Sequence, residues 1–306
     1  MICDVHCHIA SLEHTPQSFI EGSIENVLEM MSARGIPATR KHLWKMYERK
    51  MQDALCDELV AEMDEAGISR AVLLAADFTW VLKDCALTIE ETYQRHRAVM
   101  ERHPGRLAVF AGVDPRWGKS GLDLFERSVR EYGFSGMKLY PPCGYSPSDR
   151  AFDPYYELCS ELRLPVMIHI GPTSPVLSSQ HAEPFNVDEP ANRFPRVRFI
   201  LAHAAVNHVE ECAMLARFRP NVYADISAFQ LSLGWRRPAE RLQWLLSQGI
   251  NHKILFGTDW PVFRLQGSQK SFVEALTSEN GILLDLPDVE RDLILYKNAE
   301  RILSRD

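Results

Sequence analysis

The residues best suited to chemistry stand close to the N-terminus, in the segment Asp4-Val5-His6-Cys7-His8. Side chains alternate across a strand, so we expect Asp4, His6 and His8 to share one face. Two imidazoles on one face can converge on one cation, and neutral imidazole is a common ligand of zinc and related divalent metals. We expect Asp4 to support the ligands or to bind backbone instead. Such histidine pairs also occur by chance on surfaces, so a metal site needs further ligands.

Three more polar residues each close an apolar run of the sequence. His169 follows P-V-M-I, His203 follows F-I-L-A, and Asp259 follows I-L-F-G-T. Each of them alone could be a capping group or a satisfied buried histidine. In a parallel barrel, however, residues at the same end of strands one, five, six and eight meet over the mouth, where barrel enzymes place their chemistry. An open sheet would scatter them along its edge.

Further residues could hold a substrate. Lys138 lies inside the apolar run G-M-K-L-Y-P-P, and an unpaired buried ammonium is costly. It could be a carboxylated lysine that bridges two metals, a cation that holds a substrate carboxylate, or half of a structural ion pair. Arg264 is a second candidate carboxylate anchor, and Tyr140 a candidate substrate contact at the same strand end as Lys138. His181 could reach a substrate from the segment after the fifth expected strand.

Short apolar runs alternate with amphipathic stretches along the whole chain, which predicts an α/β fold. Eight runs are expected strands: 2–6, 70–74, 107–113, 136–140, 166–170, 199–202, 222–225 and 254–257. Apolar residues at spacings of three and four predict helices between them, for example at 55–66, 122–132, 155–162, 209–217 and 240–247. We expect a single (β/α)8 TIM barrel over residues 1–306, with a doubly wound open sheet as the alternative.

Two connections are longer than a barrel needs. Residues 10 to about 50 separate the first strand from its helix, and residues 172–196 follow the fifth strand. Long loops of this kind usually form lids or substrate walls, and otherwise decorate the surface. The first one carries a basic run, which is either a solvated helix face or a rim that attracts anions: Arg34, Arg40, Lys41, His42, Lys45, Arg49 and Lys50.

Composition limits the possible partners. The 306 residues include 46% hydrophobic and 25% charged residues and carry a formal net charge of −7, without a basic block of the kind that binds nucleic acid or anionic membranes. No apolar run of membrane-spanning length and no signal peptide is evident. The seven cysteines form no C-x-x-C pair. We therefore expect a cytoplasmic protein that acts on a small molecule.

The motifs taken together resemble the amidohydrolase superfamily, in its amidohydrolase-related branch of metal-dependent hydrolases and decarboxylases. The resemblance is carried by D-V-H-C-H, G-M-K-L-Y-P, F-D-P-Y-Y-E-L-C-S-E-L-R-L-P-V-M-I-H-I-G, F-I-L-A-H-A and I-L-F-G-T-D-W-P, in that order along nearly the whole chain. It implies that His6, His8, His169 and Asp259 bind one divalent metal ion, usually Zn²⁺, with Mn²⁺ or Co²⁺ as alternatives. His203 would then act on substrate or water beside the metal, and Asp259 would be both ligand and proton acceptor. Lys138 aligns with the lysine that is carboxylated in two-metal members, but single-metal sites are commoner in this branch.

Three functional hypotheses follow. The first is a metal-dependent hydrolase that acts on a C–O or C–N bond of a small carboxylated substrate, such as a lactone or amide. The second is a non-oxidative decarboxylase, a lyase, that acts on an aromatic or muconate-type acid. The third is a barrel without metal or catalysis, against which the complete ligand set argues. A homodimer is a further expectation.

Overall fold

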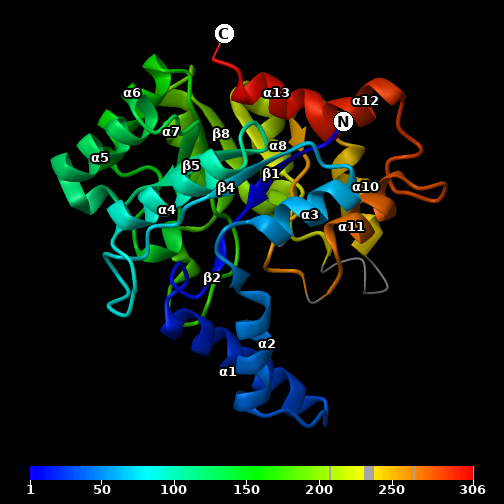
Figure 1. The fold of residues 1–306 in the computed structure, drawn as a ribbon. Helices are drawn as coiled ribbons and strands as arrows, with labels where there is room; N and C mark the ends of the chain where they lie inside the picture. Colours follow the sequence, from blue (N-terminus) through cyan, green and yellow to red (C-terminus); the bar gives the residue numbers. More distant parts are fainter. Residues whose placement is uncertain (207, 231–237, 265, 306) are drawn as a thin grey trace.

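The fold is an eight-stranded parallel β/α barrel (Figure 1). The computed structural model describes residues 1–306 except 207, 231–237, 265 and 306. The barrel strands follow one another in the order of the chain: β1 (Cys3–Cys7), β4 (Arg70–Leu74), β5 (Leu107–Gly112), β6 (Gly136–Leu139), β7 (Pro165–Ile168), β8 (Arg198–Leu201), β9 (Val222–Asp225) and β10 (Ile254–Leu255). All seven pairings between successive strands are parallel. The expected TIM barrel is confirmed.

The last strand approaches the first through backbone hydrogen bonds, which distinguishes the barrel from an open sheet. The Val5 amide donates to the carbonyl of Phe256 at 3.0 Å, and the His8 amide donates to Trp260 at 2.7 Å. Between them the Asp259 amide donates to the carbonyl of His6 at 2.7 Å. This last bond ties the two chain segments that carry the expected metal ligands.

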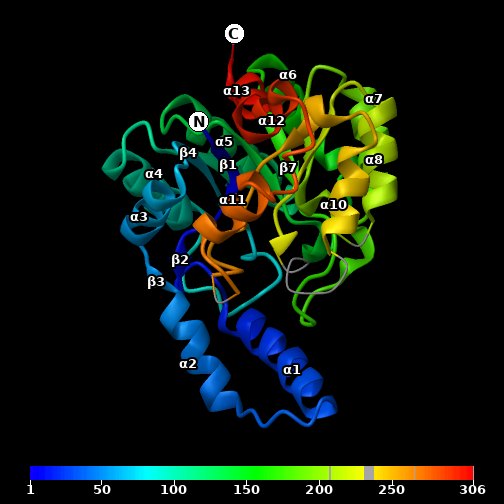
Figure 2. The ribbon, with the colours of Figure 1, turned by 90° about the vertical axis from the view of Figure 1, so that its right-hand side faces the viewer.

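One helix follows each barrel strand and covers the outside (Figure 2). In strand order these helices are α3 (Asp57–Ala66), α4 (Ile89–Arg102), α5 (Gly118–Arg130), α6 (Asp153–Glu161), α7 (Asp188–Arg193), α8 (Val209–Phe218), α10 (Pro238–Leu246) and α11 (Gln269–Thr277). The chain ends in α12 (Asp288–Asp292), a π-helical segment at Leu293–Lys297 and α13 (Asn298–Leu303). None of the described helices is both long and apolar enough to cross a bilayer.

Both faces of the strands are buried, because alternate side chains enter two hydrophobic clusters. On β4, Val72 and Leu74 belong to the inner cluster, whereas Ala71 and Leu73 pack on the outer helices. The inner cluster includes Ile302 of α13, which closes the end of the barrel away from the expected site. Burial on both faces is the usual state of parallel strands and explains their nearly continuous apolar runs.

The expected long connection after the first strand is present, and it is folded into regular elements. It contains a two-stranded antiparallel ribbon, β2 (Ala10–Ser11) with β3 (Gln52–Asp53), and two helices, α1 (Gln17–Ala33) and α2 (Arg40–Lys50). The two helices form a hairpin that projects from the end of the barrel opposite α12 and α13 (Figures 1 and 2). A small apolar cluster joins them, with Ile20, Ile24 and Leu43 buried. Ile20 and Ile24 are four residues apart, so they lie on one face of α1 and pack on α2.

The connection after β7 also carries structure. Two short 3-10 turns, at Ser179–His181 and Pro184–Val187, lead directly into α7. The segment is therefore an irregular arm followed by a short crossover helix.

Candidate metal centre and its cavity

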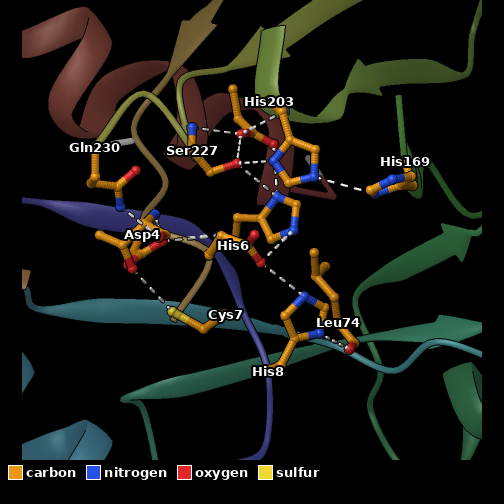
Figure 3. Close-up of polar contacts among 12 residues, drawn as sticks. Asp4, His6, Cys7, His8, Leu74, His169, His203, Ser227 and Gln230 are labelled. Carbon is orange, nitrogen blue, oxygen red and sulfur yellow. Dashed lines mark hydrogen bonds and ion pairs between the residues drawn. The ribbon is translucent and has the colours of Figure 1, made fainter. Parts of the chain in front are cut away.

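Four imidazoles and one carboxylate converge at the carboxyl end of the barrel (Figure 3). His6 lies on β1 and His8 just after it, while His169, His203 and Asp259 follow β7, β8 and β10. His203 and Asp259 adopt left-handed backbone conformations, with φ of 65° and 54°. Non-glycine residues rarely adopt this conformation unless the surrounding structure holds them there, and such strain concentrates at functional sites.

The hydrogen bonds of His6 and His8 fix which ring nitrogen is free. His6 Nδ1 lies 3.0 Å from Oδ2 of Asp225, and His8 Nδ1 lies 2.8 Å from the carbonyl oxygen of Leu74. A carboxylate and a carbonyl accept only, so each Nδ1 carries the proton. In the neutral rings, both Nε2 atoms therefore present lone pairs.

These two lone pairs face the carboxylate of Asp259. Its Oδ1 lies 3.5 Å from Nε2 of His6 and 3.2 Å from Nε2 of His8. Three electron-rich atoms at such distances repel one another unless a proton or a cation lies among them. This donor set of two imidazoles and a carboxylate is one that a divalent transition metal prefers.

A second pair of nitrogens meets on the other side of the same centre. His169 Nε2 donates to the carbonyl of Pro172 at 3.1 Å, which leaves its Nδ1 bare. The hydroxyl of Ser227 donates to Asp225 in a short contact, so its oxygen accepts from Nδ1 of His203 at 2.9 Å. The bare atoms, Nδ1 of His169 and Nε2 of His203, lie 3.2 Å apart. They again form an arrangement that a cation would satisfy.

Burial keeps these histidines neutral, as metal ligands must be. Burial lowers the pKa of His6 and of His169, and it lowers the pKa of His203 to about 4. For Asp259, burial acts to raise the pKa, but positive charge held by His6, His8 and His203 outweighs burial, so the pKa of this carboxyl lies below its usual value. The centre is thus ready to receive a cation at neutral pH.

His203 also belongs to the group of residues that could bind a single metal ion. Among the described residues, one group of three offers donor atoms that all lie within 4.8 Å of one another: His6, His203 and Asp259. The ligand set implied by the sequence has His8 and His169 with His6 and Asp259, and all four lie at this centre too. One ring nitrogen of His203 therefore lies within 4.8 Å of the donor atoms of His6 and Asp259, so the geometry does not set His203 apart from the implied ligands.

Asp225 is a functional residue that the sequence analysis missed. It ends β9, is fully buried, and bonds to His6 through Oδ2 and to the His203 amide through Oδ1 at 3.1 Å. Burial acts to raise its pKa, but the imidazoles of His6 and His203 outweigh this effect and lower it. A signal was available, because Asp225 closes an apolar run just as His169 and His203 do.

Asp4 does not share a face with His6, and that expectation is wrong. The pairing of β1 with β4 shifts by one residue between Asp4 and Cys7, a bulge that turns Asp4 outward. Its carboxylate accepts from the amides of His6 and Thr258, each at 3.0 Å, and from Gln269 of α11. The expectation that Asp4 binds backbone and supports the ligand strand is confirmed.

The centre opens into a cavity of about 390 Å³ with largely apolar walls. Phe19 of the hairpin and Phe78 after β4 pack on Tyr140, whose ring stacks on His169 at 4.4 Å between centroids. Tyr140 lines the cavity as expected for a substrate contact. A helical hairpin thus supplies part of the cavity wall, which agrees with the expectation of a substrate wall.

Two lysines bring positive charge into this cavity. Lys138 on β6 is 1% exposed, and burial lowers its pKa to about 8, while Asp225 and Asp259 attract its charge. Lys50, the last residue of α2, lines the cavity and donates to the carbonyl of Val262 at 3.0 Å. Burial lowers the pKa of Lys50 to about 8 as well. Of the basic run in the first connection, Lys50 is therefore the part that reaches the site.

Arg264 and His181 do not line the cavity in the described structure, contrary to expectation. The guanidinium of Arg264 bonds to Glu62 at 2.7 Å and to Glu58 at 2.5 Å, both on α3. These two carboxylates draw it to the outside of the barrel. His181 is half-buried on the 3-10 turn after β7, and no signal in the sequence distinguishes it from an inward residue.

Comparison with known proteins shows the family. Residues 3–305 match the family model described as "Amidohydrolase". The chain therefore belongs to the amidohydrolase family, and it is an enzyme of that metal-dependent family. A curated relative, 2-keto-4-carboxy-3-hexenedioate hydratase from Sphingobium sp. (strain NBRC 103272 / SYK-6), is 26% identical over 227 residues. That alignment covers 61% of this chain and 61% of the relative.

Solved structures share the fold at lower identity. 4-Oxalomesaconate hydratase from Rhodopseudomonas palustris is 19% identical with a TM-score of 0.63, over 100% of this chain and 96% of that one. 5-Carboxyvanillate decarboxylase from Novosphingobium aromaticivorans, complexed with manganese and 4-hydroxy-3-methoxy-5-nitrobenzoic acid, is 14% identical with a TM-score of 0.65, over 98% and 94%. The same barrel fold therefore occurs in hydratases and in decarboxylases, so the fold alone does not show which reaction this chain catalyses.

Proposed function

We propose that this protein is a metal-dependent hydrolase that cleaves a C–O or C–N bond of a small carboxylated substrate. The observation that carries the proposal is the convergence of bare nitrogens from His6, His8 and His203 on the Asp259 carboxylate, beside an apolar cavity that contains a buried lysine. A divalent cation bound there supplies a Lewis acid, which lowers the pKa of water toward neutrality and stabilises negative charge on a substrate oxygen.

The residues of the chain divide the proton transfers between them. Asp259 accepts the proton of the attacking water and passes it to the leaving oxygen or nitrogen. Within the described structure no protein group donates a hydrogen bond to its Oδ2, so that atom can accept the proton. His203, whose bare Nε2 points to the same centre, accepts a hydrogen bond from the water and orients it. Its pKa of about 4 keeps it an acceptor at neutral pH.

Lys50 and Lys138 would hold the substrate carboxylate. A cation in a mostly apolar cavity attracts an anion strongly, since water screens the interaction little. Lys50 contributes from the hairpin side and Lys138 from the barrel floor. Lys138 lies among the charges of Asp225 and Asp259, so Lys50 is the better placed of the two to bind an incoming anion.

We favour Zn²⁺ as the ion, because three imidazoles and a carboxylate suit it, with Mn²⁺ and Co²⁺ as alternatives that accept the same donors. The manganese in the related decarboxylase supports that alternative. A cytoplasmic location agrees with the seven free cysteines, because free thiols are typical of reducing compartments. We also propose that the protein forms a homodimer.

A non-oxidative decarboxylase is the second candidate, supported by the related decarboxylase of the same fold. The hydratase relative adds a third outcome, addition of water to a C=C bond. Reactions run in H₂¹⁸O on a panel of lactones, amides, aromatic acids and unsaturated tricarboxylic acids would separate these activities. Hydrolysis places ¹⁸O in the product with cleavage of a C–O or C–N bond. CO₂ release with no ¹⁸O in the organic product would instead show decarboxylation, and loss of the alkene signal by NMR would show hydration.

A further inference from the structure

Two histidines outside the metal centre line the same cavity. His14 follows β2, and His96 lies on the inner face of α4, with ring centroids 5.3 Å apart in an edge-to-face arrangement. His96 is only 2% exposed. The proposed reaction assigns no role to either residue.

Both rings carry nitrogens that the protein leaves unpartnered. His96 Nδ1 donates to the Thr92 carbonyl at 2.7 Å, and no group of the described chain lies within hydrogen-bonding distance of its Nε2. The same holds for both nitrogens of His14. Buried polar atoms nearly always have a partner, so three unpartnered nitrogens in one cavity wall point to a ligand group that completes them.

The protonation of the two rings defines that group. Burial lowers the pKa of His96 to about 3 and that of His14 to about 4, so both are neutral at pH 7. Because Nδ1 of His96 carries its proton, Nε2 can only accept. A neutral His14 has one N–H donor and one acceptor. A hydroxyl group binds to both rings, since it donates to Nε2 of His96 and accepts from the N–H of His14. The third nitrogen, the acceptor of His14, is left for a second donor.

We infer that His14 and His96 form a hydroxyl-binding subsite, and that the substrate is a small acid with a hydroxyl group remote from the metal. This inference rests on the proposed function, because it places the reacting end of the substrate at the metal. A second metal ion is the less favoured occupant. Within the described chain, no third potential ligand joins these two histidines in a metal-binding group.

The test uses matched probes. The 2-, 3- and 4-hydroxybenzoates, the corresponding methoxybenzoates and benzoate are titrated calorimetrically into zinc-loaded protein. We expect at least one hydroxybenzoate to bind roughly tenfold more tightly than its methoxy partner, the effect of a buried hydrogen bond. In His96→Leu this ratio falls to about one, with zinc content and benzoate affinity unchanged, whereas His96→Gln keeps an acceptor oxygen and part of the preference.

Several results would overturn the subsite. They are an unchanged preference in both His96→Leu and His14→Leu, metal-dependent binding of benzoates without any hydroxyl preference, or a second bound zinc that His96→Leu removes. The second of these leaves the proposed function intact.

A second experiment, which does not depend on the metal, tests the hydroxyl subsite separately from the proposed function. Phenol and anisole are titrated into protein with ¹⁵N-labelled histidine. A shift of the His96 Nε2 resonance with phenol alone, absent in His96→Leu, supports the subsite even if no benzoate binds the metal centre. Equal responses to phenol and anisole contradict it.

Discussion

Nδ1 of His6 lies 3.0 Å from Oδ2 of Asp225, and this contact turns Nε2 of the same ring toward Asp259. Asp225 also accepts from the His203 amide and from the Ser227 hydroxyl. One buried carboxylate therefore fixes both the tautomer of a metal-binding histidine and the position of the histidine beside it. Carboxylates of this kind also raise the basicity of the ligand they hold.

We predict that Asp225→Asn weakens metal binding by roughly 10- to 100-fold, the usual effect of removing such a carboxylate. The amide keeps the size of the side chain but loses its charge, and it can present N–H to the ring in place of an acceptor. Competition with a chelator measures the affinity. Asp77→Asn is the matched control, because Asp77 is also buried yet bonds to Thr79 and Trp117 instead of a ligand. Equal affinities in the two variants would refute this role for Asp225.

His203→Asn is expected to keep the metal and lose turnover by roughly 10²–10⁴, the range for loss of an acid–base group. Four donors remain in this variant, enough for a zinc site. Asparagine is chosen because it tolerates the left-handed conformation that His203 adopts, with φ of 65°. Metal content by elemental analysis and turnover are measured together, with His181→Asn, outside the cavity, as control. Loss of the metal would show that His203 is itself a ligand.

The barrel could be predicted because apolar runs and amphipathic stretches alternate regularly along the sequence. The run at residues 70–74 is β4 to the residue, since parallel strands buried on both faces read as apolar runs. The convergence of His169, His203 and Asp259 follows from the fold, because strand ends meet at a barrel mouth. Both inferences need only local pattern and topology.

The sequence-based predictions fail where one extra residue, or a partner far away in the chain, determines the position of a side chain. One extra residue in β1 turns Asp4 away from His6, and a bulge leaves no mark in the composition of a strand. Arg264 faces outward because Glu58 and Glu62, about two hundred residues earlier, bind it. Lys50 reaches the cavity only because the base of the hairpin α1–α2 lies at the barrel mouth. Such contacts are tertiary, and periodicity does not encode them.

Lys50→Met is expected to raise KM for the carboxylated substrate by roughly 10- to 100-fold with a smaller change in kcat. A hydrogen bond to a charged group contributes about 1.5–3 kcal/mol, and each 1.4 kcal/mol is a factor of ten. Methionine retains the length and apolar contacts of the lysine stem. Lys253→Met is the control, because Lys253 is also buried but donates to the carbonyls of Ala216 and Arg219 outside the cavity. A Lys50 variant with unchanged KM would remove it from the binding site.

We expect the free energy of unfolding to decrease as the pH falls, in part because His96 is neutral in the folded protein. Burial lowers its pKa from 6.5 in the unfolded chain to about 3 in the folded protein. Between these values the unfolded chain binds a proton that the folded protein does not, so stability decreases as pH falls from about 6.5 toward 3. One such proton gives a slope of about 1.4 kcal/mol per pH unit.

In urea unfolding between pH 7.5 and 5, His96→Phe should therefore show a shallower loss of stability than the parent protein. His42→Phe, at an exposed position of α2, serves as the control and should retain the parent slope. Identical slopes for the parent and His96→Phe would show that the ring is not buried in its neutral form.

Asp259→Asn separates the two roles proposed for this carboxylate. Asparagine fits the left-handed conformation at φ of 54° and keeps one oxygen for a weak metal contact, but its amide cannot accept a proton at neutral pH. We expect weaker metal binding and a collapse of kcat that excess metal does not restore. If Asp259 only closed a strand end, the variant would lose melting temperature and keep its activity per folded molecule. Metal content, melting temperature and kcat measured on one preparation distinguish these outcomes. Near-normal kcat in the metal-replete variant would exclude Asp259 as the proton acceptor, because no other change in the site could compensate for a base that cannot take the proton.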